Sequence, residues 1–144
     1  MLFGKRERLI SRILVVEDEP LVAFDNEHLL GESGYEVVAT VDTLDDARAV
    51  IESEELDLVL TDIRLRGEGD GADVARLARD RGVPVLFVTG HCPDEAQSLA
   101  VGCLAKPYGD KVLKAALDCL DDHLQGKEVR KLPPQLSLYE RAEG

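Results

Sequence analysis

Chemically versatile side chains stand directly after four short apolar runs of this chain. In chain order they are Glu17 with Asp18, then Asp62, Thr89 and Lys106. Three carboxylates held close together repel one another, so one takes up a proton unless a cation compensates. A few oxygen ligands open to solvent suit Mg²⁺ with retained waters. A carboxylate beside Mg²⁺ and an ammonium group is suited to receive a phosphoryl group, whose oxygens a hydroxyl would help to hold.

These side chains can meet only if the apolar runs are neighbouring strands. Short continuous runs read as strands buried on both faces of a parallel sheet. They lie at residues 13–16, 37–41, 56–60, 83–88 and 101–105. The side chains named above follow the carboxyl ends of such strands, and these ends share one edge of a parallel sheet. Ligands of open α/β sheets bind at that edge.

The segments between the strands carry helix signals. Pro20 suits a first helical turn, and Thr43 with Asp46 suits a capping box. Apolar residues at helical spacing end before a stop at Gly126. The interval 90–101 leaves room for only about two helical turns, so this fourth helix is expected to be short or mobile. The resulting fold class is α/β, a flavodoxin-like doubly wound (βα)5 fold with five parallel strands in the order 2-1-3-4-5.

Composition narrows the function classes. The chain has 144 residues, with 17 Lys and Arg against 29 Asp and Glu, and a formal net charge of −12. Such an acidic chain repels a polyphosphate, and aromatic residues make up only 4%, which disfavours nucleic-acid binding. No apolar stretch suits a membrane span or a secretory signal. The three cysteines, Cys92, Cys103 and Cys119, predict no disulfide framework, and a reducing cytosol fits best.

Four motifs carry a resemblance to a known family. In chain order they are ILVVEDEP, LVLTDIRL, VLFVTG and LAKPY, and over residues 11–126 the chain resembles the receiver domain of two-component response regulators. The resemblance implies that Asp62 is the phosphoacceptor, that Thr89 is the switch hydroxyl and that Lys106 pairs with the phosphoryl group. The implied Mg²⁺ ligands are Glu17, Asp18, Asp62 and the main-chain carbonyl of Arg64. Lys106–Pro107 resembles the family's cis peptide.

The sequence departs from the common receiver pattern at Cys103, where most members carry an aromatic switch residue. Together with Phe87 to Gly90 and a short fourth helix, this is similar to the subgroup nicknamed FAT GUY, whose members are often stand-alone receivers working with histidine kinases. We therefore expect residues 90–102 to become ordered on phosphorylation. Arg64 and His91 each stand two positions after a site residue. They either hinder the water that hydrolyses the aspartyl phosphate or point into solvent.

The expected organisation is a short basic arm at 1–10, the receiver domain at 11–126 and a C-terminal tail at 127–144 with no output domain. The tail could fold back, mediate self-association or stay disordered. The expected partners are a sensor histidine kinase or phosphotransfer protein and a downstream regulator protein, with no nucleic acid and no membrane. The expected state is a cytoplasmic monomer or weak homodimer.

The leading interpretation is a response regulator that is not an enzyme and signals by protein contact or phosphate drainage. A phosphorylation-independent kinase-binding or scaffold module with a receiver fold is the alternative. An aspartyl phosphatase would need a second acid where Arg64 stands, since a guanidinium does not act as a general acid. A flavin-binding module of the same topology would have to bind the cofactor phosphate at the first loop. That loop carries Glu17, Asp18 and Glu19, which repel an anion.

Overall fold

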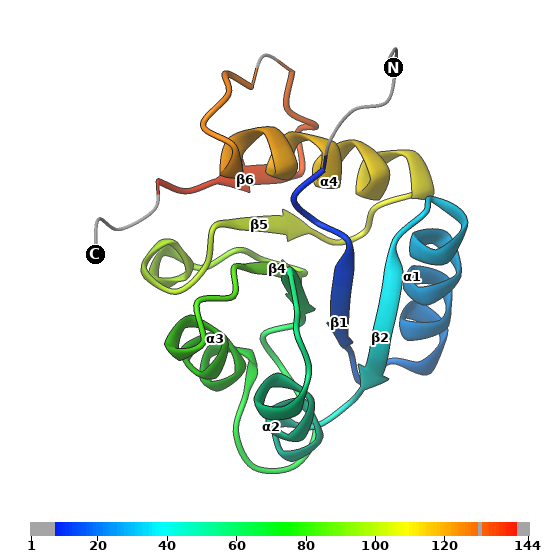
Figure 1. The fold of residues 1–144 in the computed structure, drawn as a ribbon, viewed down its shortest axis with the longest axis vertical. Helices are drawn as coiled ribbons and strands as arrows, with labels where there is room; N and C mark the ends of the chain where they lie inside the picture. Colours follow the sequence, from blue (N-terminus) through cyan, green and yellow to red (C-terminus); the bar gives the residue numbers. More distant parts are fainter. Residues whose placement is uncertain (1–7, 130, 141–144) are drawn as a thin grey trace.

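The computed structural model describes residues 8–129 and 131–140, which form one layered α/β domain (Figure 1). Its strands are β1 (Arg12–Val16), β2 (Glu36–Val41), β3 (Leu58–Thr61), β4 (Val85–Thr89), β5 (Gly102–Ala105) and β6 (Leu136–Leu138). Its helices are α1 (Pro20–Glu32), α2 (Leu44–Ser53), α3 (Gly71–Asp80), the 3-10 helix η1 (Asp94–Ser98) and α4 (Asp110–Leu124). No helix among the described residues is both long and apolar enough for a membrane span.

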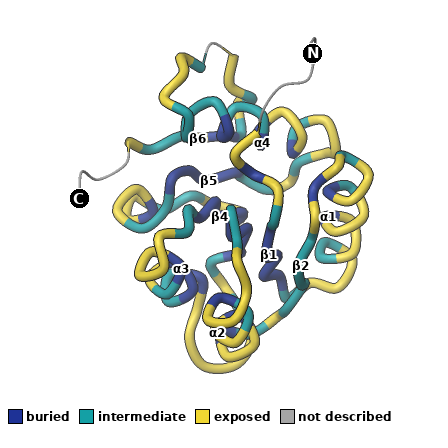
Figure 2. Tube along the Cα trace, in the orientation of Figure 1, coloured by how far each residue is buried: buried dark blue, intermediate teal, exposed yellow. Residues whose placement is uncertain are grey.

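The sheet has the order β2-β1-β3-β4-β5-β6, and its first five strands are parallel. The predicted order 2-1-3-4-5 is therefore confirmed. Alternate residues of each central strand pack on opposite faces: Ile13 and Val15 contact the side covered by α1 and α4, whereas Leu14 and Val16 contact the side covered by α2 and α3. Burial on both faces explains why these strands are continuous apolar runs, and the buried centre is visible in Figure 2.

The helices begin and end where local signals predict. Pro20 occupies the first turn of α1. The Thr43 side chain accepts a hydrogen bond from the amide of Asp46 and begins α2. Both halves of a capping box are present at the start of α3, between Asp70 and Asp73. Gly126 follows α4 with a φ of 77°, a left-handed conformation that favours glycine.

The segment between β4 and β5 contains only the five-residue 3-10 helix η1, which confirms that this helix is short. The same segment corrects the prediction about cysteines, because Cys92 and Cys103 form a disulfide. The chain leaves β4, folds back over β5 and brings together two residues 11 apart in sequence. Sequence spacing carried no sign of this pairing, since it depends on the path of the loop.

The sixth strand, β6, was not predicted. It runs antiparallel to β5, with Gln135 O accepting a hydrogen bond from the Ala105 amide and Val101 O from the Tyr139 amide, both at 2.9 Å. A Cβ on Gly102 would stand 2.9 Å from the carbonyl oxygen of Ser137, so this glycine permits the close pairing. Of the three possibilities for the tail, its described residues fold back onto the domain.

Residues outside the predicted domain limits also enter the core. Ile10 and Leu136 are buried with the side chains of α4. The division at residues 10 and 126 stays a prediction, and residues 1–7, 130 and 141–144 lie outside the described part of the chain.

Candidate functional site

The carboxyl ends of β1 and β3 bring three acids together. The amide of Glu17 donates to Val41 O at 2.9 Å, and the amide of Asp62 donates to Val16 O at 3.0 Å, so the residues just past both strands are fixed by the sheet. One carboxylate oxygen from each of Glu17, Asp18 and Asp62 lies within 4.8 Å of the other two. The sequence prediction that these three acids converge is met by the geometry.

Lys106 lies between two of these acids. Its Nζ atom donates to Glu17 Oε1 and to Asp62 Oδ2, each at 2.8 Å, and Glu19 Oε1 is 3.8 Å away. The main-chain amide of Lys106 donates to Thr89 O at 2.7 Å, which fixes the lysine to the end of β4. The Lys106–Pro107 peptide bond is cis, as the resemblance implied. The ammonium group is thus held at the acidic cluster by the sheet behind it.

The site has an excess of negative charge that one ammonium does not remove. Burial raises the pKa of Glu17 above its usual 4.5, and the hydrogen bond from Lys106 only partly opposes that rise. Burial alone lowers the pKa of Lys106, but its hydrogen bonds to Asp62 and Glu17 outweigh burial and raise that pKa. The lysine therefore stays charged, while Glu17, only 2% exposed, carries a charge at a cost. A second cation would relieve that cost.

A cavity of about 630 Å³ opens in front of Asp62. Asp18, Thr89 and His91 are on its wall, together with Asp62 and Lys106. Thr89 is the last residue of β4, and His91 follows in the loop leading to η1. The cavity thus joins Asp18, Asp62, Lys106 and Thr89 in one solvent-accessible space large enough for a phosphoryl group and water, while Glu17 contacts Lys106 but does not line it.

Arg64 has its backbone at the site and its side chain exposed. Its amide donates to Asp62 Oδ1 at 3.2 Å, and the residue lines the same cavity. This places the Arg64 main chain beside the acids, where its carbonyl was expected to serve as a ligand. That ligand role stays a prediction, as do the roles of the site side chains.

Two contributions to the site were missed from sequence. Gly71, the first residue of α3, packs against the backbone of Asp62 and Ile63, where a Cβ would stand 2.1 Å from Asp62 O. On the other side, the Tyr108 hydroxyl donates to Oδ1 of the buried Asn26 at 3.1 Å, which ties the loop after Lys106 to α1. The sequence offered only two signals of these contributions: a glycine, Gly71, at the start of a helix, and a polar residue, Asn26, among the apolar residues of α1.

The donor set suits magnesium. Carboxylate oxygens on an open cavity, with room for retained waters, are the ligands that Mg²⁺ takes in proteins. Glu17, Asp18 and Asp62 supply such oxygens within 4.8 Å of one another, and the single ammonium of Lys106 contacts only two of these three carboxylates. These residues fit a bound divalent cation.

Comparisons with known proteins agree with this arrangement. The family model described as the response regulator receiver domain matches residues 13–118. The transcriptional regulatory protein PdtaR of Mycobacterium tuberculosis is 30% identical over 148 residues, which cover 92% of this chain and 71% of PdtaR. The phyllosphere-induced regulator PhyR of Methylorubrum extorquens is 35% identical over 85 residues, covering 58% of this chain and 32% of PhyR. The chain spans less than half the length of the first three curated relatives.

Solved structures show the same fold. A response regulator receiver protein from Sinorhizobium medicae matches with a TM-score of 0.68 and 31% identity, over 78% of this chain and 95% of that one. The receiver domain of a sensor histidine kinase from Pseudomonas aeruginosa, solved with a magnesium ion coordinated in its active site cleft, matches with a TM-score of 0.66 and 28% identity, over 75% and 94% of the two chains. The family match spans more than half of the sequence and includes all the acids of the site. This chain belongs to the response regulator receiver domain family.

Proposed function

We propose that this protein is a response regulator whose receiver domain accepts a phosphoryl group on Asp62 from a histidine kinase or phosphotransfer protein. The observation that carries the proposal is the position of Asp62, whose carboxylate lies 2.8 Å from the Lys106 ammonium and within 4.8 Å of Glu17 and Asp18. Signalling then proceeds by protein contact or by draining phosphate from the kinase.

The chemistry follows from these contacts. A carboxylate oxygen of Asp62 forms a bond to the phosphorus of a phosphohistidine as the phosphorus–nitrogen bond breaks, and the electron pair of that bond stays on the imidazole nitrogen. Lys106 is placed to donate to a phosphoryl oxygen on Asp62, and Thr89 lines the same cavity, where its hydroxyl would hold another phosphoryl oxygen. Glu17, Asp18 and Asp62 would hold Mg²⁺, which supplies neutralisation of the phosphoryl oxygens when bound.

The proposal also includes the subgroup of receiver domains to which this protein belongs. Cys103 in place of an aromatic residue and the short η1 support the FAT GUY subgroup. The expected location is the cytoplasm, and no turnover of an external metabolite is expected.

The test is phosphotransfer from acetyl phosphate and from candidate kinases, read by mass spectrometry. Wild type should gain one phosphoryl group in the presence of Mg²⁺, and removal of the metal with a chelator should prevent the gain. Asp62→Ala should gain none. Asp80→Ala changes an exposed acid on α3 far from the site and serves as the matched control. An equal gain in Asp62→Ala would overturn the proposal.

A scaffold that binds a kinase without being phosphorylated is the second candidate. Exposed apolar side chains on α1, Leu21 at 80% and Phe24 at 66%, favour a protein contact near the site. Kinase binding that is equal for wild type and Asp62→Ala, with no phosphotransfer to either, would support this candidate.

A further inference from the structure

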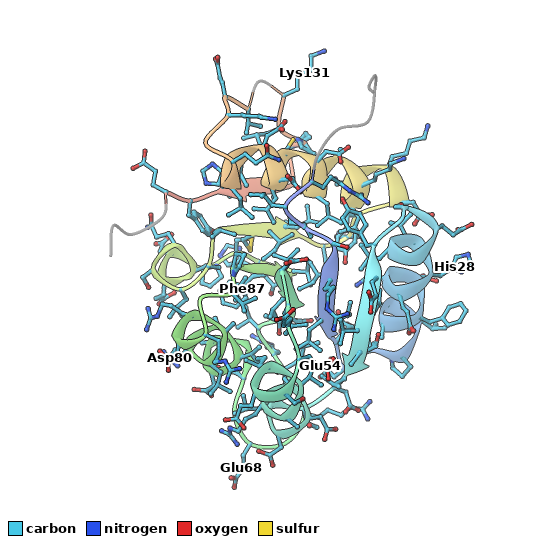
Figure 3. All side chains as sticks on the ribbon, viewed as in Figure 1. His28, Glu54, Glu68, Asp80, Phe87 and Lys131 are labelled. Carbon is cyan, nitrogen blue, oxygen red and sulfur yellow. A yellow bond between two sulfur atoms is a disulfide. The ribbon has the colours of Figure 1, made fainter. Side chains whose placement is uncertain are left out.

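The disulfide joins the wall of the candidate site to the buried sheet. Cys103 is fully buried in β5, where it pairs with Phe87 of β4. Its partner Cys92 is only partly buried and follows Thr89 by three residues. The bond between the two sulfur atoms is drawn in yellow in Figure 3. The bond is therefore a covalent tether between a fixed strand and a loop at the site.

The tethered loop forms part of the cavity that faces Asp62. Gly90, His91 and Pro93 line this cavity together with Thr89. Cys92 lies between these lining residues, so its bond to Cys103 restrains the main chain on both sides of it. The bond at Cys92 therefore restrains the part of the cavity wall that faces Asp62.

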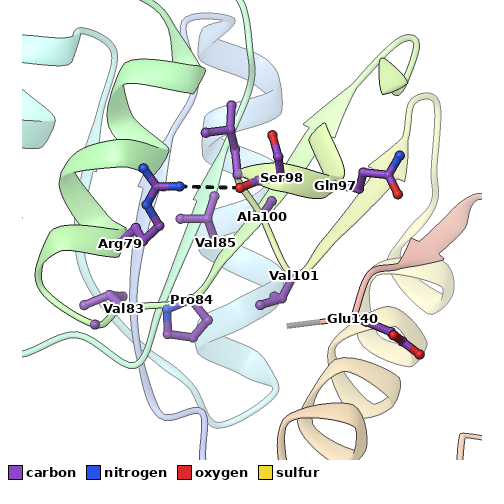
Figure 4. A pocket seen from close by; sticks show the side chains of 11 residues that line it. Arg79, Val83, Pro84, Val85, Gln97, Ser98, Ala100, Val101 and Glu140 are labelled. Carbon is purple, nitrogen blue, oxygen red and sulfur yellow. Dashed lines mark hydrogen bonds between the residues drawn. The ribbon is translucent and has the colours of Figure 1, made fainter. Parts of the chain in front are cut away.

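Apart from the disulfide, residues 91–100 make few hydrogen bonds to the rest of the domain. Within the described chain, the hydrogen bonds of residues 91–100 run inside the segment, apart from one in which Arg79 on α3 donates to Ser98 O at 3.5 Å (Figure 4). A cavity of about 200 Å³ beside that contact is lined by residues of α3, η1 and β4. Ala96 is the one fully buried side chain of η1. Without the disulfide, the segment would be anchored mainly by Ala96 and its neighbours.

We propose that Cys92 and Cys103 are a reversible redox pair whose oxidation restrains residues 90–93 and weakens the affinity of the site for a phosphoryl group. This inference rests on the proposed function of Asp62. Closure of the cavity wall on new phosphoryl oxygens requires the loop to move, and the tether to β5 opposes that movement. Disulfides in a reducing compartment are usually transient and serve catalysis or redox sensing.

The oxidant is a small disulfide such as oxidised glutathione. The thiolate of the more accessible Cys92 attacks one glutathione sulfur and releases the first glutathione thiolate. The thiolate of Cys103 then attacks the Cys92 sulfur, breaks the mixed disulfide and releases the second. The two cysteines lose two electrons, the glutathione disulfide gains them, and the two thiol protons end on the released glutathiones. Reduction by glutathione is the reverse sequence.

The experiment measures beryllofluoride affinity in the presence of Mg²⁺ by calorimetry, on full chain prepared in both redox states and checked by mass spectrometry. The reduced protein should bind about 5-fold more tightly or better, the lower end of typical coupling between two sites. Coupling is reciprocal. Beryllofluoride should therefore shift the glutathione equilibrium of the Cys92–Cys103 pair toward the dithiol by the same factor.

Two variants complete the design. Cys92→Ser should bind as tightly as the reduced protein under both conditions, whereas Cys119→Ser, which changes the cysteine outside the disulfide, should keep the full redox response. Equal affinity of the oxidised and reduced wild type would overturn the redox inference and leave the role of Asp62 intact. Absence of binding in the reduced wild type and in Cys92→Ser would overturn the proposed function, and this inference with it.

Discussion

Two buried carboxylates at opposite ends of the sheet are held by different sets of hydrogen-bond donors. Glu17, at the carboxyl ends of the strands, is 2% exposed and faces the ammonium of Lys106. Asp121, on α4, is 1% exposed, and its two oxygens accept hydrogen bonds from the amides of Leu9 and Ile10. Asp121 thus accepts two backbone amides and the side-chain amide of Gln125, and all of these donors serve structure. Glu17 accepts one backbone amide, from Glu19, and its other partner is the Lys106 ammonium, which can exchange partners and leaves this end available for chemistry.

The comparison explains why only one end of the sheet has the properties of a site. Backbone amides cannot leave Asp121 without moving the chain before β1, so this carboxylate stabilises the fold. Lys106 contacts both Glu17 and Asp62, so under the proposed function it would release Asp62 to a phosphoryl group and keep its contact with Glu17.

Replacing Lys106 with Met should slow phosphorylation of Asp62 about 100-fold, because the loss of one preorganised donor to developing charge has an effect of that order. Initial rates with acetyl phosphate measure it. Lys111→Met, on the exposed side of α4, is the control and should keep the wild-type rate. An unchanged rate in Lys106→Met would show that this ammonium does not act on the reacting group.

Replacing Asp121 with Ala should lower the free energy of unfolding by about 2–3 kcal/mol, because the buried Ile10 amide loses its acceptor. Denaturant unfolding measures the loss, and Asp80→Ala is the matched control with an exposed acid. Mg²⁺ affinity should stay at the wild-type value. A loss of Mg²⁺ affinity in Asp121→Ala would break the separation between the two ends.

Replacing Gly71 with Ala should lower the free energy of unfolding by about 1–3 kcal/mol, the usual range for overpacking, and should also weaken Mg²⁺ binding. The added methyl group would meet the backbone that carries Asp62. Gly31→Ala, in α1 with open space around the position, is the control and should be neutral or stabilising. Normal Mg²⁺ affinity in Gly71→Ala would contradict the positioning role of this glycine.

Glu17 should make stability depend on pH in the absence of metal. Because burial raises its folded-state pKa above 4.5, the folded protein holds this proton more tightly than the unfolded chain. Its contribution is thus greatest below pH 4.5 and is lost as pH rises through the raised pKa. Relative to Glu17→Gln, wild type should lose stability over that window.

Adding Mg²⁺ should change the difference in stability between wild type and Glu17→Gln. A cation that binds only the folded protein stabilises it, and the carboxylate of wild-type Glu17 should bind it better than the amide of Glu17→Gln. The deficit of wild type at neutral pH should therefore shrink or reverse when Mg²⁺ is added. If the unfolding free energies of wild type and Glu17→Gln change with pH in parallel, both with and without Mg²⁺, an excess of negative charge at the carboxyl ends of the strands is contradicted.

The smallest effect concerns the rim of the cavity. The double substitution Arg64→Ala with His91→Ala should speed loss of the phosphoryl group from Asp62 several-fold, with no change in unfolding free energy. Both residues line the cavity and are exposed, so they can hinder the attacking water without supporting the fold. Decay after removal of the phosphodonor measures the effect. An unchanged rate would mean that both side chains point into solvent.

Strands and site residues could be predicted because both depend on local pattern. Continuous apolar runs identify strands buried on two faces, and the residue after each run must then lie at one edge. Asn26 shows the limit of this reasoning. It falls on the inner side of α1 and is buried against Tyr108, whereas the apolar Phe24 is exposed. Leu30 of α1 is buried in the core, and the burial of polar Asn26 on the same helix is accompanied by the hydrogen bond from Tyr108, in the loop after β5.

The rest could not be predicted because it depends on contacts between distant segments. The Cys92–Cys103 bond needs the fold of the loop after β4. Asp121 was not singled out because its amide partners lie more than a hundred residues earlier in the chain. β6 has only three residues after two prolines, too short a pattern to identify a strand.

β6 has a consequence for self-association through strand pairing. An uncovered β5 would offer a row of free amide and carbonyl groups to any passing strand. With β6 in place, the outermost strand on that side is three residues long, and Pro133 and Pro134, which lack amide donors, precede it. Among the described strands, β2 at the opposite edge of the sheet is the edge strand with the longer row of unpaired amide and carbonyl groups. Pairing through β2 would join two molecules, and such a pair would offer only its short β6 edges for further growth.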